Sequence, residues 1–416
     1  MTVGLLFLVA VAVLWAVIAY QLVLTAAGFT LWRSSLRASV PDDGEVEWPT
    51  LSVLIPAHNE ERVIEATLEA LAAQSYPEGR FEVLVINDGS TDRTAELVAK
   101  VAKRHPQVRL LDIPAGRGGR GKSAALNVGL AQTESELVAV YDADNTPEPH
   151  ALRILVHELM AQPELGAAIG KFRTVNRSRN LLTRCINLET IAFQWIVQAG
   201  RWVLCRVATL PGTNYVIRRH LLEELGGWDE GAIAEDSEMS MRIYEMGGLI
   251  KFVPTAVTWE QEPETLEVWL RQRTRWARGN NYVFAKFLER QDRFVSRRTR
   301  FEMGVFLSLF YVFFGAVVIS DLLFVASLMD LARVSFTGPF DLVFASALVL
   351  FVLELMLVAS FEGERGPRVV LLALVMYFTY CQLWIWVVTR ALFEDLVLRR
   401  KHVWHKTPRF ARDRAA

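Results

Sequence analysis

The sequence is short of cysteine, of clustered histidines and of net charge, and each shortage excludes a class of protein. The 416 residues include three cysteines, Cys185, Cys205 and Cys381, in no CxxC or CxxH pattern, and the seven histidines form no HExxH motif. A disulfide framework and a zinc site of these kinds are therefore excluded. With 45 basic and 46 acidic residues the formal net charge is −1. No basic field therefore favours nucleic acid as a partner, and no acidic excess favours a disordered chain.

What the chain has in excess is apolar sequence, and the excess is concentrated in four runs. The first, residues 3–32, carries no formal charge; a bilayer core needs about 20 apolar residues, whereas a signal peptide needs about 7 to 15. We therefore predict an N-terminal transmembrane helix over residues 1–32. The later runs are residues 303–329, 340–361 and 369–393. They predict about three more transmembrane helices within residues 301–393, with Asp321 and Glu354 facing protein or a cavity rather than lipid.

Basic residues beside these runs predict the side of the membrane on which the intervening region lies. Arg33 and Arg37 follow the first run. The arginines before the second run are Arg290, Arg293, Arg297, Arg298 and Arg300. Because flanking Lys and Arg stay in the cytoplasm, residues 50–290 are predicted to form a cytoplasmic domain of an integral protein of the cell (plasma or inner) membrane. The basic tail, residues 394–416, conflicts with one span before the domain and three after it. Either one late run is not a full span or the tail breaks the rule.

The region between the first two runs alternates strand and helix patterns. The expected strands are residues 51–55, 81–86, 108–113 and 137–141. The expected helices are residues 60–74, 92–104 and one that begins at Lys122. Such alternation produces right-handed βαβ units. The sequence therefore predicts an α/β fold with a mostly parallel sheet, in which ligands bind beyond the carboxyl ends of the strands.

Each distinctive polar cluster falls where a predicted strand ends. The clusters are Pro56-Ala57-His58-Asn59-Glu60, Asn87-Asp88-Gly89-Ser90-Thr91-Asp92 and Tyr141-Asp142-Ala143-Asp144-Asn145. The parallel strands would bring them to one edge of the sheet. The second cluster also fits a turn followed by a helix with Ser90 or Thr91 as its N-cap, and turn chemistry explains it equally well.

Asp142 and Asp144 form the pattern with the clearest chemistry. Residues separated by one position point to the same side of an extended segment, so both carboxylates can converge on one hard cation. Two like charges held that close repel one another unless a cation lies between them. Mg²⁺ and Mn²⁺ keep open positions for phosphate oxygens. The pair therefore predicts a metal site for a nucleotide diphosphate.

Lys122 ends a basic, glycine-rich stretch that resembles a phosphate-binding loop only superficially. Gly116 and Gly121 have the spacing of GxxxxGK[ST], but no strand directly precedes them. Two interpretations stay open. In one, Lys122 reaches a phosphate at the start of the next helix; in the other, the stretch is a solvated basic loop.

Two later segments add a candidate base and a candidate diphosphate-binding face. Glu235 and Asp236 precede an amphipathic stretch; one carboxylate is expected to cap the helix and the other to be free as a base. Gln272, Arg275 and Trp276 share one face of a predicted helix through their i, i+3, i+4 spacing. An amide, a guanidinium and an aromatic plane suit a diphosphate and a sugar ring. The alternative is an interfacial helix with snorkelling arginines.

Seven motifs follow one another along the chain. They are Pro56-x-x-Asn59-Glu60, Asn87-Asp88-Gly89-Ser90, Gly121-Lys122-x-x-Ala125-Leu126-Asn127, Asp142-x-Asp144, Gly212-Thr213-Asn214, Glu235-Asp236 and Gln272-x-x-Arg275-Trp276. This ordered set resembles the family 2 inverting glycosyltransferases. With the flanking apolar runs it is similar to the membrane-embedded processive synthases of poly-N-acetylglucosamine, cellulose, chitin oligosaccharide and hyaluronan. The resemblance covers about residues 50–290 and implies a GT-A-like fold.

The resemblance also implies a role for each matching residue on the donor side. The residues that would hold the uracil and ribose of a UDP-sugar are Pro56, His58, Glu60 and Asp88. Asp142 would touch the nucleotide, and Asp144, with Asp142, would bind Mg²⁺ or Mn²⁺ on the diphosphate. Lys122 would help to neutralise the leaving diphosphate.

On the acceptor side the resemblance makes Asp236 the general base that deprotonates the acceptor hydroxyl. The residues that would line the acceptor site are Gly212, Thr213 and Asn214. The residues that would bind the diphosphate and the acceptor end of the chain are Gln272, Arg275 and Trp276.

Four departures favour the poly-N-acetylglucosamine branch over the cellulose branch. Asn87 stands where an aspartate is common, and Ala234 stands where cellulose synthases commonly carry Thr. A Phe-Phe-x-Cys pattern is missing before Gly212. No cyclic-dinucleotide-binding domain is expected after the last run.

The sequence thus predicts an enzyme that polymerises a β-linked sugar from a UDP-sugar, with UDP-N-acetylglucosamine favoured, and exports the growing polysaccharide across the lipid bilayer. The sequence leaves open whether an accessory export or regulatory subunit takes part. Residues 181–203 and 264–288 are expected to lie at the membrane interface, with Trp195 and Trp202 stacking on sugars or anchoring in headgroups. The alternatives are a cellulose-like UDP-glucose polymerase, a hyaluronan-type synthase, a non-processive enzyme acting on a lipid acceptor, and a transporter or receptor that only binds a nucleotide-sugar.

Overall fold

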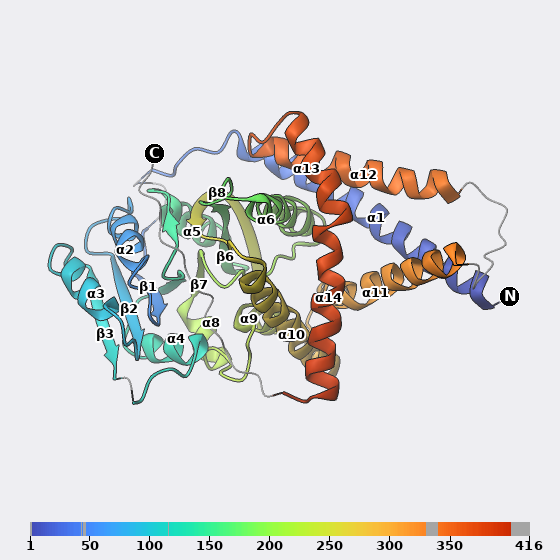
Figure 1. Cartoon of the computed structure of the whole chain (residues 1–416). Coiled ribbons are helices and arrows are strands. Elements are labelled where there is room, and N and C mark those ends of the chain that lie inside the picture. Colours follow the sequence, from blue (N-terminus) through green and yellow to red (C-terminus); the bar gives the residue numbers. More distant parts are fainter. Residues whose placement is uncertain (1, 43, 45–46, 115, 330–339, 401–416) are drawn as a thin grey trace.

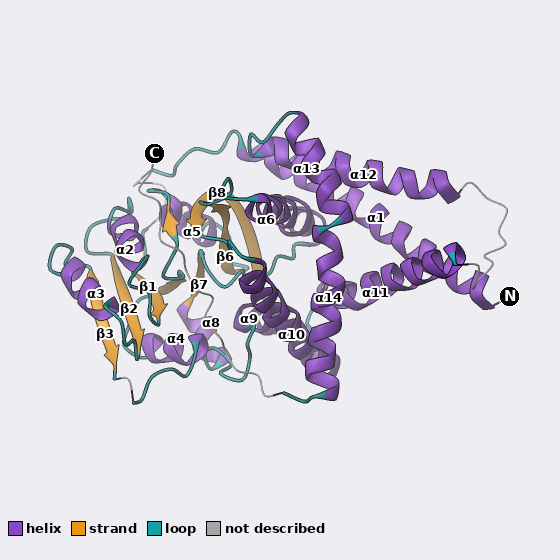
Figure 2. Ribbon diagram, in the orientation of Figure 1, coloured by secondary structure: helices purple, strands orange, loops and turns teal. Residues whose placement is uncertain are grey.

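A computed structural model describes residues 2–42, 44, 47–114, 116–329 and 340–400. A sheet with flanking helices forms one part of the molecule, and long helices extend away from it on one side (Figure 1). The strands gather at the end of the molecule that is farthest from the N-terminus (Figure 2).

The sheet has eight strands in the order β3-β2-β1-β4-β7-β6-β8-β5. Their bounds are β1 Leu51–Ala57, β2 Phe81–Asp88, β3 Val108–Ile113, β4 Leu137–Val140, β5 Thr146–Pro147, β6 Leu165–Thr174, β7 Tyr215–Arg218 and β8 Leu249–Glu260. The neighbours β3, β2, β1 and β4 pair in parallel. β7 runs antiparallel to β4 and β6, and the short β5 runs antiparallel to β8. The predicted mostly parallel α/β sheet is therefore confirmed, but strands β5 to β8, which include the antiparallel β5 and β7, were not among the predicted strands.

Helices flank the sheet and continue into the extended part. Those of the sheet region are α2 Ile64–Ala72, α3 Thr94–Ala102, α4 Lys122–Leu130, α5 Ala151–Met160, α8 Arg219–Leu225 and α9 Glu235–Glu245. The others are α1 Thr2–Ser35, α6 Leu181–Ala192, the π-helix η1 Phe193–Gln198, α7 Ala199–Cys205, α10 Leu266–Arg290, the 3₁₀ turn η2 Gln291–Arg293, α11 Arg297–Leu328, α12 Phe340–Phe361, α13 Pro367–Phe378, α14 Tyr380–Leu392 and the π-helix η3 Phe393–Val397.

The predicted strands agree closely with β1 to β4 because each is a run of buried apolar residues. Val53, Leu54 and Ile55 in β1 are fully buried, as are Val83 and Val85 in β2. Central parallel strands are covered on both faces, so they read as continuous apolar runs. The helix expected from residue 60 instead begins at Ile64, since residues 61–63 form a turn.

Three described helical segments are long and apolar enough to cross a membrane. They are Gly4–Ser35, Arg297–Ser320 and Pro367–Val397. The described apolar part of α12, Ala345–Phe361, is shorter, so the transmembrane helix predicted over residues 340–361 stays a prediction. Glu354 in α12 accepts a hydrogen bond from Thr25 in α1 at 2.9 Å. It faces protein, as expected. The side chain of Asp321 and tail residues 401–416 lie outside the described part.

The expected interfacial stretches are two helical segments that join the sheet region to the extended helices. One is the continuous run α6–η1–α7 and the other is α10. α1 packs so closely on the first that a Cβ on Gly28 would lie 2.0 Å from the Trp195 carbonyl oxygen, and one on Gly200 would lie 2.5 Å from that of Leu24. Small residues such as Gly28 and Gly200 allow the backbones of two crossing helices to approach closely.

α14 runs along α10 at the boundary between the two parts (Figure 1).

Candidate active site

The loops after β1 and β2 are joined by hydrogen bonds. Asn59 donates its backbone N–H to Ser90 Oγ at 2.8 Å and accepts from the Thr91 N–H at 2.8 Å. His58 Nδ1 lies 2.7 Å from the Asp88 carbonyl oxygen. Pro56 is inside β1, opposite Ile86.

The start of α3 differs from the expectation. The predicted cap by Ser90 or Thr91 is wrong: α3 begins at Thr94, whose backbone N–H donates to Asp92 Oδ1 at 3.0 Å. The Ser90 hydroxyl instead accepts from Asn59. The Glu60 backbone N–H donates to Thr94 Oγ1 at 2.7 Å. Both bonds join the first loop to the second.

Asp88 holds the glycine-rich loop that precedes α4. Its Oδ1 accepts from the Gly119 N–H at 2.8 Å and its Oδ2 from the Gly121 N–H at 3.3 Å. Gly118 passes so close that a Cβ there would lie 2.6 Å from the Gly89 nitrogen. These contacts hold the loop against the end of β2. Because the loop leads directly into α4, they also place Lys122, the first residue of α4, at the edge of the sheet.

Lys122 lies at the centre of the cluster. Its Nζ is 2.6 Å from Asp142 Oδ1, 2.7 Å from the Gly212 carbonyl oxygen and 3.3 Å from Glu235 Oε1. Burial by itself would lower the pKa of Lys122, but Asp142 and Glu235 outweigh it, so the pKa is raised above its ordinary value. The ammonium therefore stays charged. A solvated basic loop does not describe this residue.

Asp142 and Asp144 lie in a turn after β4 and not in an extended segment, so strand alternation does not explain their approach. Asp142 turns to Lys122, and its backbone N–H donates to Thr213 Oγ1 at 3.0 Å. Asp144 is 1% exposed, and its Oδ2 accepts from the Gln261 N–H at 3.2 Å.

Asp236 lies beside this cluster in the first turn of α9. A Cβ on Gly212 would lie 3.1 Å from Asp236 Oδ2, and Gly212 has φ +83°, so a side chain at that position is disfavoured on both grounds. The expected N-cap is wrong: Ala234 is the cap position, without a side-chain bond, and Glu235 and Asp236 follow it. Burial and then Glu235 raise the pKa of Asp236 to about 7, against the opposing effect of Lys122.

α10 approaches the same carboxylate. A Cβ on Gly279 would lie 2.5 Å from the Ala234 Cβ, so α10 packs tightly against the start of α9. One turn earlier, the charge of Arg275 lowers the pKa of Asp236. Of the predicted face of α10, Arg275 is therefore the residue that approaches the cluster around Lys122 and Asp236. Trp276 is 43% exposed, and the Gln272 side chain accepts a hydrogen bond from Arg273.

Three predicted contacts with substrate do not fit the geometry. Asn214 is fully buried, and its side chain is hydrogen-bonded to Tyr141, Lys171 and Ala256, so it does not line a substrate site. Trp195 and Trp202 are 2% and 4% exposed. Neither stacks on a sugar nor anchors in headgroups.

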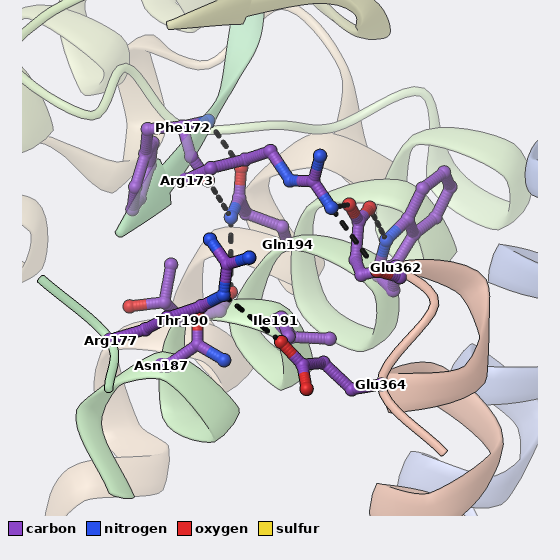
Figure 3. A pocket seen from close by; sticks show the side chains of 10 residues that line it. Phe172, Arg173, Arg177, Asn187, Thr190, Ile191, Gln194, Glu362 and Glu364 are labelled. Atoms are coloured by element: carbon purple, nitrogen blue, oxygen red, sulfur yellow. Dashed lines mark hydrogen bonds and ion pairs between the residues drawn. The ribbon is translucent and has the colours of Figure 1, made fainter. Parts of the chain in front are cut away.

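Trp195 instead belongs to a polar contact between the sheet region and the loop after α12. Its indole N–H donates to Glu362 Oε1 at 2.8 Å. Arg173 pairs with Glu362 and Arg177 with Glu364, around a cavity of about 10 Å³ that has room for one water (Figure 3). Figure 3 also shows Gln194 turned toward Phe172. These ion pairs hold the loop after α12 against the sheet region, and the cavity between them is too small for a sugar.

The residues after β4 can contribute two carboxylates to a divalent cation. Among the described residues, no group of three or more His, Cys, Asp and Glu side chains is arranged to hold a metal. Mg²⁺ in nucleotide sites is typically held by one or two carboxylates plus phosphate oxygens and water. Asp142 and Asp144 therefore fit a cation that arrives with a diphosphate.

Sequence reasoning assigned no role to Arg273 and Glu189, and it did not predict that Glu235 would pair with Lys122. Glu235 pairs with Lys122, and Arg273 is 1% exposed and paired with Glu189 at 2.6 Å. The one available signal for Arg273 was a charge four residues after Trp269, on the side of α10 that carries buried residues.

Comparison with known proteins is decisive for the family. Residues 49–279 match the family described as "Glycosyltransferase like family 2". The chain belongs to this family. It is 41% identical over 411 residues to "Probable glycosyltransferase YdaM" of Bacillus subtilis, covering 97% of this chain and 98% of the relative. A "Poly-beta-1,6-N-acetyl-D-glucosamine synthase" of Staphylococcus epidermidis is 26% identical over 364 residues, 84% of each chain.

A solved structure supports the fold of this glycosyltransferase. A mannosyltransferase from Pyrobaculum calidifontis, in complex with GDP-Man and Mn²⁺, matches with a TM-score of 0.63 at 23% identity, over 90% of this chain and 99% of that chain. The predicted GT-A-like fold is confirmed.

Proposed function

We propose that this glycosyltransferase transfers sugar from a UDP-sugar, with UDP-N-acetylglucosamine favoured, to a growing β-linked polysaccharide, with inversion and repeatedly on one chain. One observation carries the proposal: Asp236 Oδ2 and Lys122 Nζ converge on the open side of Gly212, where a Cβ would lie 3.1 Å from the first and 3.4 Å from the second, and Lys122 is paired with Asp142. A candidate base and a candidate diphosphate-neutralising group thus border the same space, which the missing side chain of Gly212 leaves open.

The proposed chemistry uses a base and a cation that border one space. The acceptor hydroxyl gives its proton to Asp236 as its oxygen bonds to the anomeric carbon. The bond from that carbon to the diphosphate oxygen breaks on the opposite face, and UDP leaves with the electron pair. Attack from the opposite face inverts an α-linked donor. A carboxylate with a pKa of about 7 is half-ionised near neutral pH, which suits a general base.

On the leaving side, Lys122 and Arg275 offset the charge that develops on the diphosphate. Asp142 and Asp144 would hold Mg²⁺ or Mn²⁺, which when bound supplies further positive charge to the diphosphate oxygens. The loops after β1 and β2, with Pro56 and His58, form the wall on which the uracil and ribose would lie.

Acceptor binding and export rest on the position of α10. α10 begins at the sheet region, passes Asp236 and runs along α14 of the membrane part. The exposed Trp276 lies on this path. The name of the S. epidermidis relative, a poly-β-1,6-N-acetylglucosamine synthase, supports a polymeric product and UDP-N-acetylglucosamine.

The proposed location is the cell membrane, with the catalytic domain in the cytoplasm, where nucleotide-sugars are made. A reporter fused near Asn281 would then be cytoplasmic; an extracytoplasmic signal there contradicts the proposal. A reporter at Ala416 tests the predicted span over residues 340–361, because a cytoplasmic tail needs an even number of crossings after the cytoplasmic domain, and three late spans would leave the tail outside.

The deciding experiment combines donor choice with product length. Purified protein is given a panel of UDP-N-acetylglucosamine, UDP-glucose, UDP-glucuronic acid and GDP-mannose, and nucleotide release and product size are measured. Release of UDP with a long product supports the proposal. A single added sugar on a lipid indicates the non-processive alternative. Binding without release indicates a transporter or receptor.

A further inference from the structure

Arg273 is a charged residue in a place where charge is costly. Its side chain is 1% exposed and lies on α10 between two tryptophans. The guanidinium carbon is 3.9 Å from the centre of the Trp276 ring and 5.9 Å from that of Trp269. Burying an ionised group is unfavourable unless it is paired and hydrogen-bonded, so the surroundings must provide compensation.

Glu189 of α6 provides that compensation. Its Oε2 lies 2.6 Å from Arg273 Nη2 and accepts from the Tyr380 hydroxyl at 2.8 Å, and its Oε1 accepts from the Trp384 indole at 2.8 Å. The Tyr380 hydroxyl in turn accepts from the Trp269 indole at 2.9 Å. Glu189 therefore binds α10 and α14 at one point.

That point is where a membrane-length segment breaks. α13 ends at Phe378 and α14 begins at Tyr380, with Thr379 between them in a non-helical conformation. The network of Glu189, Arg273 and Tyr380 therefore ties the start of α14 to the α10 turn that carries Trp276.

Arg273 also sets the orientation of two predicted substrate-binding side chains. It donates from Nη1 to Gln272 Oε1 at 2.8 Å, and its planar group covers one face of the Trp276 indole. Trp276 nevertheless stays 43% exposed. A ring that is held on one face by a flat cation is already oriented before a sugar binds. The Trp276 side chain therefore loses less conformational entropy when a sugar packs on its exposed surface.

We propose that Arg273, held by Glu189, is a positioning residue that fixes Trp276 and Gln272 for the acceptor chain and links them to membrane helix α14. This inference rests on the proposed polymerase function. In this arrangement Arg273 acts only through Trp276 and Gln272, and its loss affects retention of the acceptor more than turnover of the donor.

The test uses the full-length protein in detergent with the donor that supports UDP release. Arg273→Lys keeps the charge beside Glu189 but removes the planar group. Two quantities are measured at low conversion: the rate of UDP release, and the mean number of sugars per product chain. We expect chains roughly threefold to tenfold shorter, as a weakened cation–aromatic contact allows, with the KM for the donor within about twofold of wild type.

Arg278→Lys is the matched control. Arg278 is on the same helix and pairs with Asp395 at 2.6 Å and with Glu394 at 3.5 Å, so it also connects α10 to the C-terminal helices. This variant should keep the wild-type chain length. Glu189→Gln, which keeps an acceptor for Trp384 but removes the charge, should shorten chains as Arg273→Lys does.

The outcomes separate the inference from the proposed function. Shorter chains with Arg273→Lys and not with Arg278→Lys support it. Wild-type chain length with Arg273→Lys overturns it, as does a fall in UDP release with unchanged chain length, which indicates a structural role. If wild type adds a single sugar, the polymerase proposal has failed; the KM for the acceptor then replaces chain length, and an unchanged KM in Arg273→Lys overturns the positioning role.

Discussion

Replacing Asp236 by Asn separates the shape of this side chain from its ability to take a proton. The two residues are nearly isosteric, but the amide cannot act as a base. General-base assistance is worth roughly a hundred- to ten-thousandfold, so sugar transfer should fall by at least about a hundredfold. Affinity for UDP should stay within a few-fold, because Lys122 and Asp142 are unchanged.

The same substitution should make the protein more stable at alkaline pH. The pKa of Asp236 is about 7 in the fold, whereas an aspartate in an unfolded chain titrates near 4. Between these values the folded state binds more protons, so the free energy of unfolding falls as pH rises. The full loss is about 4 kcal/mol, at about 1.4 kcal/mol for each pH unit. Partial exposure of Asp236 reduces this to about 1–2 kcal/mol, which the uncharged Asn recovers.

The assay is a pair of thermal unfolding curves, at pH 8 and pH 5, with UDP binding measured by calorimetry. Asp236→Asn should exceed wild type at pH 8, and the advantage should shrink at pH 5. Asp229 provides the control of opposite sign. Although burial opposes it, hydrogen bonds from Lys286 and Tyr282 lower the pKa of Asp229 to about 2, so Asp229→Asn should lose stability at pH 8.

Two results would refute this reasoning. If Asp236→Asn unfolds at a lower temperature than wild type at pH 8, the carboxylate is not held at a raised pKa. If it loses UDP binding as severely as transfer, Asp236 holds the donor and the base is another group.

Three further predictions follow from the same cluster. Asp144→Asn keeps the shape of a buried side chain but removes a charged ligand for a hard cation; transfer should fall at least about a hundredfold, and normal activity of both this variant and chelator-treated wild type would rule out the metal site. Trp276→Ala should abolish long products while membrane insertion and UDP binding persist, and normal-length polymer would make this face structural. Glu235→Gln removes a negative charge beside Asp236 and should move the midpoint of the pH–kcat/KM curve from near 7 to about one pH unit lower; an unchanged midpoint would contradict the source of the raised pKa.

Strands β1 to β4 and the polar edge of the site were predictable because both follow from short-range patterns. The strand at residues 108–113 was predicted at its observed bounds, and the glycine-rich loop delivers Lys122 where the next helix was expected to start. Strands β5 to β8 were missed: β5 and β7 are two and four residues long, the pairing of β7 with β4 joins positions 75 to 81 apart, and β6 pairs with β8 across 83 to 86 positions.

The errors arose where tertiary packing decides the role of a residue. Trp195 lies in the stretch 181–203, which was expected at the membrane interface, but an acidic residue from the loop after α12 accepts its indole N–H. Asp142 and Asp144 were expected to align by strand alternation, yet β4 ends at Val140 and the chain turns. No spacing rule indicates that Arg273 finds its partner in Glu189, 84 residues earlier.

The close packing of α1 at Gly28 against η1, and of α7 at Gly200 against α1, has a consequence for the order in which the protein is assembled. On the proposed topology α1 enters the membrane first, while its partner α7 is 172 residues farther along the chain. At 5–20 residues per second, roughly ten to thirty seconds of synthesis pass before Gly200 leaves the ribosome. During that interval the apolar surface of α1 around Gly28 has only lipid or insertion machinery beside it. The docking of the catalytic domain against α1 is therefore a late event in biogenesis. A side chain at Gly28 or Gly200 would hinder this step, although both residues lie far from the reacting groups.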